Sequence, residues 1–515
     1  KLARTQRREL FSPSPLPLLA VQTDHPDQQM RLFYQTLAAF PDLAYYDVDI
    51  PLPLRHAAVY NTFPLARCSV HTDQDNRLQE LHVLNSPWEI NPPAPPLRIL
   101  RLETDVDPAR RDPQMLLIHA GPHTYRLKLS PLRPALVNLR SILNRHDPDL
   151  LLTAGGDTWL LPYLLQACEQ EHFPLPLNRD TRREPAHHAE RSYFSYGQVV
   201  HRGRQVHLFG RWHIDSGNAM LWDSFELEGV LETARVTSLP VQTAARVSPG
   251  TGISAMQILT ALRGGILAPW RKQQVETPKS ALQMFSSDQG GLVYQPVIGL
   301  HRDVAEIDFV SMYPGIMVHF NISPETVQTC PPQAKDLAQI LPEHSQDGKP
   351  SGLVPQTLAP LLQKRIALKN HLLTCPPWDP QRNTDKARAS AHKWLLVTCF
   401  GYLGYKNARF GRIEAHEAVT AYGREALLRA KEIVEGLGFE VLHMYVDGLW
   451  IRKKGASKVA DFQPALEAIA RDTGLPISLD GIYRWVAVLT SPGNAQVPVP
   501  KSYFCVFQDC SLKTS

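Results

Sequence analysis

A single carboxylate stands between two runs of bulky apolar and aromatic side chains in the segment HMYVDGLWI, residues 443–451. An Asp-Gly pair between such runs predicts a tight β-hairpin. The turn is one explanation for Asp447, because Asp bonds its own backbone in turns. The other explanation is a second carboxylate, elsewhere in the chain, that needs Asp447 as a partner.

The segment VAEIDFVSMYPGIM supplies a candidate partner. Its period-2 alternation from Val304 to Val310 predicts a strand with Asp308 near its end. A cap or a solvated turn would explain a lone strand-end Asp. Two strand-borne carboxylates beside turns can instead converge on Mg²⁺, which takes its remaining ligands from water and phosphates. Two such ions can clamp the attacking and leaving oxygens of a phosphoryl transfer.

The helical pattern at 357–373 tests this chemistry. A phosphoryl-transfer site also requires basic side chains that can bind the phosphates of an incoming triphosphate. Arg365 and Lys369 are predicted to fall in the middle of its apolar face, whereas Lys364 points away. The two cations either snorkel or pair with internal acids, or they face an anionic ligand in a cleft. The leucines of that face are Leu358, Leu361, Leu362, Leu368 and Leu372.

Further helical patterns are predicted at 384–400 and 413–437. One face of the first offers cations for phosphate and an aromatic ring with space beside it for a flat base, although a ring at helical spacing is more often part of the core. That face carries Lys386, Ala389, Lys393, Val397 and Phe400, with Gly401 just beyond it.

The length of 515 residues predicts two to four domains. A net charge of +4 does not by itself imply nucleic acid, but ten Lys/Arg and only two acids lie between Lys364 and Arg412. The seven cysteines form no CxxC pair or Cys/His cluster, which fits a reducing cytosol. The predicted location is cytoplasmic, with nucleoid association in a prokaryote. No apolar run is long enough for a membrane span.

The first part of the chain ends in the proline-rich SPWEINPPAPPLR. An α/β pattern then begins, with LRILRLE and QMLLIHAG as strands and with ALVNLRSIL and WLLPYLLQACEQ as helices. Residues 247–278 are predicted to be a linker.

In this order, and over nearly the whole chain, the segments resemble the family-B DNA polymerases. DFVSMYPGIM resembles the family's motif Asp-x-x-Ser-Leu-Tyr-Pro-Ser-Ile-Ile, and LLQKRIALK resembles its triphosphate-binding helix. KWLLVTCFG is similar to Lys-x-x-x-Asn-Ser-x-Tyr-Gly, and YVDGLW stands where Asp-Thr-Asp-Ser/Gly is expected. QGGLVY resembles the linker before the palm, and KSYFCVFQDCSLK resembles the Lys-x-Tyr segment at the palm's far edge.

The resemblance implies an α/β and α+β multidomain fold. The expected parts are an N-terminal domain at 1–96, a degenerate RNase H-like exonuclease-type domain at 97–265, a linker and first part of the palm at 266–356, helical fingers with nucleotide-binding helices at 357–412, and a palm continuation at 413–515.

The resemblance also implies that Asp308 and Asp447 are catalytic and bind two Mg²⁺ ions, or Mn²⁺ as a substitute, together with the backbone carbonyl of Phe309. Tyr445 then occupies the place of the family's first aspartate. The competing register leaves Leu449 as the ligand and the site inactive. The first register is preferred because it puts Trp450 where large apolar residues normally follow.

The remaining site residues are carried over in the same way. Met312 is expected to donate its backbone N–H to the triphosphate, Tyr313 to lie under the deoxyribose and exclude a 2′-hydroxyl, and Val397 to replace an amide beside the nascent base pair. The nucleotide-binding residues are Ser311, Met312, Tyr313, Arg365, Lys369, Lys393 and Val397. The DNA-binding residues are Gly290, Gly291, Phe400, Gly401, Lys501 and Tyr503.

The exonuclease-type region departs from the family's pattern. Arg101 replaces an expected Asp and leaves only Glu103 of the first motif, whereas Gly155 and Leu160 replace the Asn and Asp of the second. The third motif's tyrosine is missing, so this region is interpreted as a remnant without proofreading activity. The sequence also stops where the family's thumb should begin. It is a fragment, or it is thumbless, or another chain supplies that part.

The leading hypothesis is a metal-dependent, template-directed DNA polymerase that uses dNTPs and a primer-template. The alternative is a catalytically inactive homologue that binds nucleic acid or acts as a scaffold. Tyr445 and the degenerate exonuclease motifs favour the alternative, whereas the retained Asp308, Arg365 and Lys369 favour the enzyme. The role is replication, repair or defence.

Overall fold

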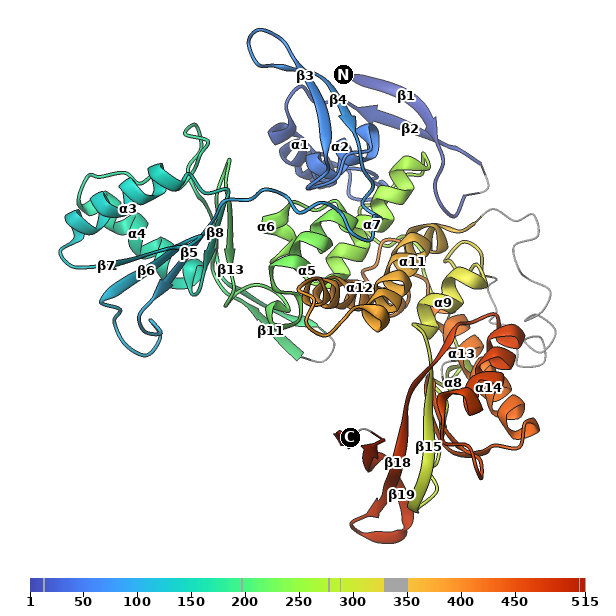
Figure 1. Cartoon of the computed structure of the whole chain (residues 1–515). Helices are drawn as coiled ribbons and strands as arrows, with labels where there is room; N and C mark the ends of the chain where they lie inside the picture. Colours follow the sequence, from blue (N-terminus) through green and yellow to red (C-terminus); the bar gives the residue numbers. More distant parts are fainter. Residues whose placement is uncertain are drawn as a thin grey trace. The chain divides into compact units, whose positions relative to one another are not determined.

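The computed structural model describes residues 1–12, 14–195, 198–276, 278–287, 289–327, 351–508 and 510–514 (Figure 1). Packing divides the chain into two compact units. Unit 1 consists of Lys1–Tyr60, Ile253–Leu373 and His392–Ser515, and unit 2 consists of Asn61–Gly252 and Thr374–Ala391. This division follows packing rather than sequence order, so the five domain ranges expected above stay predictions.

A seven-stranded antiparallel sheet with the order β14-β16-β17-β15-β18-β19-β20 forms the centre of unit 1. The middle strand, β15, buries Val304, Ala305 and Ile307, as expected for a strand that has neighbours on both edges. The predicted strand that ends near Asp308 is therefore confirmed. The strand bounds are β14 Val293–Tyr294, β15 Gly299–Phe309, β16 Glu440–Tyr445, β17 Gly448–Arg452, β18 Ile477–Ser491, β19 Asn494–Phe507 and β20 Leu512–Thr514.

The helices α13 (Ile413–Gly436) and α14 (Val459–Thr473) pack against this sheet (Figure 1). α13 buries Val419, Ala426 and Ala430, which the helical period places on one face. The other elements of unit 1 are β1 Leu2–Arg7, β2 Leu16–Val21, α1 Pro26–Ala39, α2 Leu52–Tyr60, α7 Pro249–Arg263, α8 Ala281–Ser287, α9 Met312–His319, α11 Leu353–Thr374 and α12 Gln381–Leu403, of which α7, α11 and α12 have one end in unit 2.

The three predicted helices are confirmed as α11, α12 and α13, but the inward face of α11 differs from the prediction. Lys364 is only 3% exposed, whereas Lys369 is exposed and Arg365 is half-buried. The reason is a small rotation of the buried stripe. It runs through Thr357, Leu361, Lys364 and Leu368, so the two predicted phosphate-binding cations lie on its flank.

The predicted linker at 247–278 is wrong in its first half, because α7 covers Pro249–Arg263. Pro249 stands at the first helical position, where a missing N–H is tolerated. Ile253, Met256 and Leu259 follow at helical spacing and are buried. Tertiary burial thus stabilises a helix whose glycines disfavour it in isolation.

Unit 2 contains a five-stranded sheet with the order β13-β8-β5-β6-β7. β5 pairs in parallel with β8 and antiparallel with β6, and the segments predicted as strands and helices from residue 97 onward are confirmed. This mixed sheet with helices agrees with the expected α/β, RNase H-like domain. Its main elements are β5 Ile99–Thr104, β6 Met115–Ala120, β7 His123–Lys128, α3 Leu132–His146, β8 Leu150–Thr153, the π-helix η1 Gly156–Leu160, α4 Leu161–Gln170, β13 Trp212–Asp215, α5 Trp222–Thr237 and α6 Val241–Ala244.

Short two-stranded ribbons complete unit 2. They are formed by β3 Cys68–Thr72 with β4 Leu78–Val83, by β9 Ala186–His188 with β12 Gln205–His207, and by β10 Arg191–Ser195 with β11 Gln198–Arg202. Across the described ranges of both units, none of the helices has the length and apolar character that crossing a membrane requires.

Candidate active site

Asp308 and Asp447 lie on neighbouring strands of the unit 1 sheet. Asp308 is the penultimate residue of β15, and the register pairs it with Gly448, the first residue of β17. The backbone N–H of Phe309 donates to the carbonyl of Asp447 at 2.9 Å. Two carboxylates that are far apart in sequence are thus brought to one end of one strand pair.

The hairpin that carries Asp447 is confirmed, but its turn lies one residue earlier than predicted. β16 and β17 are joined by Val446 and Asp447, and Gly448 already belongs to β17. Val446 adopts φ 58°, in the left-handed region that a β-branched residue rarely occupies. Such local strain is common beside functional sites, where the surrounding structure holds it in place.

The competing register, with Leu449 in the ligand position, is not supported by this geometry. Leu449 is fully buried and pairs with Ile307 in the middle of the sheet. Tyr445, at the place of the family's first aspartate, packs against the apolar cluster that contains Trp450. Asp447 is therefore the carboxylate of this hairpin that stands beside Asp308.

The pKa of Asp308 shows how much negative charge gathers here. Burial first, and then the charges of Asp447, Asp480 and Glu306, raise it to about 8, whereas Lys369 opposes the shift. A cluster of carboxylates that raise one another's pKa is suited to bind a hard divalent cation, because the cation would offset their negative charge. The described part of the chain contains no group of three or more His, Cys, Asp or Glu side chains arranged to hold a metal.

Asp480 was missed by the sequence reasoning. β15 pairs Glu306 with Gly481 and Ile307 with Leu479, so Asp480 is the extra residue of a β-bulge in β18. Bulges re-aim a side chain and often lie next to active sites. The hydroxyl of Ser478 is 3.4 Å from the carbonyl oxygen of Asp308 and 3.5 Å from Oδ1 of Asp480. The only sequence signal is a lone Asp within an apolar strand pattern.

The cations of α11 face this cluster. Lys369 is close enough for its charge to lower the pKa of Asp308. Arg365 Nε donates to Ser311 Oγ at 3.3 Å, which ties α11 to the turn after β15. Burial lowers the pKa of the Arg365 guanidinium. Lys369 is thus brought close to Asp308. Arg365 is tied to Ser311, which follows Asp308 by three residues.

Tyr313, in the first turn of α9, is packed from several sides. Its ring centroid lies 4.5 Å from that of Phe400, and Phe400 in turn stacks on His416 at 4.2 Å. A Cβ added to Gly423 would lie 2.8 Å from Cε1 of Tyr313, so glycine is needed there for the ring to fit. Tyr313 and Phe400, both predicted site residues, are in direct contact.

The predicted DNA-binding glycines lie beside the same hairpin. Arg424 Nη1 donates to the carbonyl of Gly290 at 2.8 Å. A Cβ added to Gly291 would lie 2.9 Å from Cγ2 of Val446 and 3.3 Å from Oη of Tyr313. Gly291 therefore lies against the turn that carries Asp447, whereas Gly290 is bound by Arg424.

The other predicted residues differ in accessibility. On α12, Lys393 and Val397 are exposed and Gly401 is half-buried, whereas Met312 on α9 is buried and leaves only its backbone for a ligand. The side chain of Lys501, on β19, lies outside the described residues.

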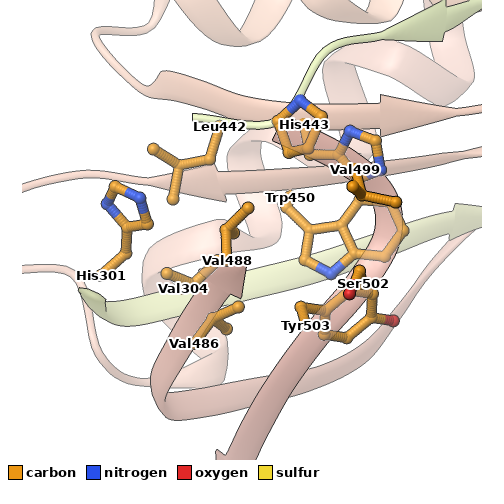
Figure 2. A pocket seen from close by; sticks show the side chains of 11 residues that line it. His301, Val304, Leu442, His443, Trp450, Val486, Val488, Val499, Ser502 and Tyr503 are labelled. Atoms are coloured by element: carbon orange, nitrogen blue, oxygen red, sulfur yellow. The ribbon is translucent and has the colours of Figure 1, made fainter. Parts of the chain in front are cut away.

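Tyr503 is 8% exposed and packs edge-to-face on Trp450, with ring centroids 5.8 Å apart. Figure 2 shows both rings, with His443, around a small pocket at the sheet. The observed role of Tyr503 is therefore packing, and its contact with DNA stays a prediction.

In unit 2, the remaining acid of the first exonuclease motif, Glu103, lies on β5 and is half-buried. Leu160, at the place of an expected Asp, is fully buried in the apolar core. The second motif contributes Asp157 instead, which is fully buried and ion-paired with Arg246 at 3.0 Å. Burial alone would raise the pKa of Asp157, but Arg246 holds it below its usual value.

Comparison with known proteins agrees with this geometry. The family model described as DNA polymerase family B matches residues 150–450, which is more than half of the chain. DNA polymerase 2 of Saccharolobus solfataricus is 31% identical over 271 residues, 53% of this chain and 39% of that protein. The DNA polymerase of Archaeoglobus fulgidus is 25% identical over 409 residues, 68% of this chain and 48% of that protein.

The solved structure of the family B DNA polymerase from the hyperthermophilic archaeon Pyrobaculum calidifontis is similar in fold, with a TM-score of 0.67 and 22% identity. The similarity covers 99% of this chain and 72% of that chain. This chain spans about half or less of the length of the curated relatives described above. The family match over more than half of its residues shows that the chain belongs to DNA polymerase family B.

Proposed function

We propose that this chain catalyses template-directed DNA synthesis, in which nucleotides from dNTPs are added to the 3′ end of a primer. The observation that carries the proposal is the convergence of Asp308 and Asp447 on paired strands, with Lys369 of α11 opposite them. A purely structural pair of acids has no need for an opposing cation that is exposed to an incoming ligand.

Different residues of the chain would bind the metal ions and the triphosphate. Asp308 and Asp447, with the backbone carbonyl of Phe309, would hold two divalent cations, Mg²⁺ or Mn²⁺. When bound, these neutralise the charge on the attacking and leaving oxygens of the phosphoryl transfer. Arg365 and Lys369 hold the triphosphate, since guanidinium and ammonium groups bind phosphate oxygens through charge-assisted hydrogen bonds.

The nucleotide's sugar and base contact a second set of residues. The ring of Tyr313 lies beneath the deoxyribose and excludes a 2′-hydroxyl. Phe400 fixes that ring from α12, and Val397, exposed on the same helix, faces the nascent base pair. The glycines at 290 and 291 guide the template strand beside the hairpin. Unit 2 contributes no proofreading, because Glu103 is the one expected acid that its first two exonuclease motifs retain.

A primer-extension assay with a defined template tests this function. The chain is expected to add the nucleotide that the template specifies, in Mg²⁺ or in Mn²⁺. Asp308→Asn is expected to slow the addition by about a thousandfold or more, because several kcal/mol of transition-state stabilisation are lost. A chain that binds primer-template but extends it with neither ion would instead support the inactive homologue.

A further inference from the structure

A fourth carboxylate, Glu306, lies two residues before Asp308 on β15. It is 8% exposed, and its charge contributes to the raised pKa of Asp308. A buried acid is stable only when its charge is paired and hydrogen-bonded. Glu306 is therefore either part of the charge that the site presents to a cation, or it is neutralised by a partner of its own.

Glu306 has such partners on strands far from it in sequence. Lys513 Nζ donates to Glu306 Oε2 at 2.6 Å, and the phenol of Tyr483 donates to the same oxygen. Lys513 Nζ also donates to the Tyr483 oxygen at 3.1 Å. Tyr483 is fully buried and Lys513 is partly exposed, so the acid, phenol and ammonium form a hydrogen-bonded group that solvent reaches mainly at Lys513.

Lys513 reaches this group from β20, the edge strand of the sheet. β20 returns from β19 and pairs with it, with Cys505 opposite Lys513. The connection is fixed by two backbone bonds, from Phe507 N–H to the Ser511 carbonyl at 2.9 Å and from Cys510 N–H to the Phe507 carbonyl at 3.0 Å. The hairpin thus holds one positive charge close to the strand that carries Asp308.

We propose that Lys513 sets the divalent-cation affinity of the Asp308–Asp447 site by balancing the charge of Glu306. The proposal rests on the proposed function, because it presumes that the two aspartates bind cations. Successive residues of a strand advance about 3.3 Å, so Glu306 stands about 7 Å along β15 from Asp308. At that separation in a partly buried site, one unit charge changes the affinity for a divalent ion by on the order of tenfold. Lys513 is a positioning residue, since it acts on the site only through Glu306.

If Lys513 balances the charge of Glu306, the two single substitutions should shift the cation affinity in opposite directions. A purely structural ion pair does not predict this. Lys513→Met leaves Glu306 uncompensated and is expected to tighten cation binding by about tenfold. Glu306→Gln leaves Lys513 uncompensated and is expected to weaken it by a similar factor. The double variant removes both charges and is expected to return the affinity close to that of the unmodified chain. Loss of packing alone would shift both single variants in the same direction.

The experiment is a Mn²⁺ titration of the full chain, followed by electron paramagnetic resonance of the free ion, alongside primer extension at rising Mn²⁺. Circular dichroism melting confirms that each variant is folded. Arg484→Met is the matched control, because it removes an exposed positive charge beside Tyr483 that solvent already screens. It is expected to leave the Mn²⁺ affinity unchanged.

Opposite shifts in the two single variants, with recovery in the double variant, would support the charge balance. Shifts in the same direction, or no shift, would overturn it. Asp308→Asn separates this outcome from a failure of the proposed function. If that variant binds Mn²⁺ as well as the unmodified chain does, the aspartate site itself is wrong. If it loses binding while the other variants do not shift, only the role of Lys513 is wrong.

Discussion

At the scale of single residues, Tyr313 is a side chain that its neighbours hold from several sides. Phe400 contacts its ring, and glycines at 291 and 423 leave the space that the ring fills. This packing limits the ring to one orientation, as the proposed role of Tyr313 in excluding a 2′-hydroxyl requires. A mobile tyrosine would admit a 2′-hydroxyl by moving aside.

Replacing Tyr313 by Ala is therefore expected to raise the use of ribonucleotides relative to deoxyribonucleotides by about ten- to hundredfold. The measurement is the ratio of kcat/KM for one ribonucleotide and its deoxy counterpart. Tyr313→Phe keeps the ring and should keep the ratio. Gly423→Ala, whose added Cβ would lie 2.8 Å from ring Cε1, should displace the ring and raise the ratio too. An Ala variant with the original ratio would exclude Tyr313 as the sugar filter.

Tyr313 was singled out by the family resemblance, whereas the strand that ends near Asp308 and the hairpin that carries Asp447 were predictable because period and turn chemistry are local. Asp480 was not, because its approach to Asp308 depends on a bulge that shifts the register of β18 against β15. A register shift arises from the pairing of two distant strands and leaves no local sequence pattern.

At the scale of elements, the two features that build the site are the β16–β17 hairpin and α11. Sequence periodicity predicted both elements, but it misplaced details within each. The turn begins at Val446, and the buried stripe of α11 includes Lys364. These details depend on what the element packs against, because a helix face or a turn residue is selected by its neighbours as well as by its own sequence.

The corrected face of α11 gives a prediction about nucleotide binding. Arg365→Ala is expected to raise the KM for dNTP by about ten- to hundredfold, since a hydrogen bond to a charged group contributes roughly 1.5–3 kcal/mol. Steady-state kinetics with a saturating primer-template measures it. Gln363→Ala, an exposed change on the same helix, is the matched control and should leave the KM unchanged. An unchanged KM in the Arg365 variant would remove α11 from the triphosphate site.

At the scale of the whole molecule, the acids of the candidate polymerase site and those of the exonuclease-type region differ in their surroundings. Asp308 and Asp447 of unit 1 lie together, whereas Asp157 and Asp215 of unit 2 are bound by protein groups. Asp215 accepts backbone N–H groups from Gly155 and Asp157, both at 2.9 Å, and Asp157 is paired with Arg246. Acids that are already satisfied by the fold are poor ligands for a metal.

The full chain is accordingly expected to show no metal-dependent 3′–5′ degradation of single-stranded DNA, since a two-ion site does not survive the loss of several acids. The assay follows a 5′-labelled oligonucleotide in Mg²⁺ and in Mn²⁺. Glu103→Ala serves as the control. Degradation that persists in this variant would come from a contaminant, whereas degradation that the change abolishes would contradict the remnant interpretation.

The most direct test of the account compares two substitutions in one hairpin, Asp447→Asn and Tyr445→Phe. The measurement is the single-turnover rate of adding one templated nucleotide in Mg²⁺, with circular dichroism to confirm that both variants are folded. Asp447→Asn is expected to lose about a thousandfold or more of the rate. Tyr445→Phe should stay within a few-fold of the unmodified chain, because its ring packs in the apolar cluster and a phenol is a poor Mg²⁺ ligand. Appreciable addition by Asp447→Asn would contradict the assignment of Asp308 and Asp447 as the catalytic pair.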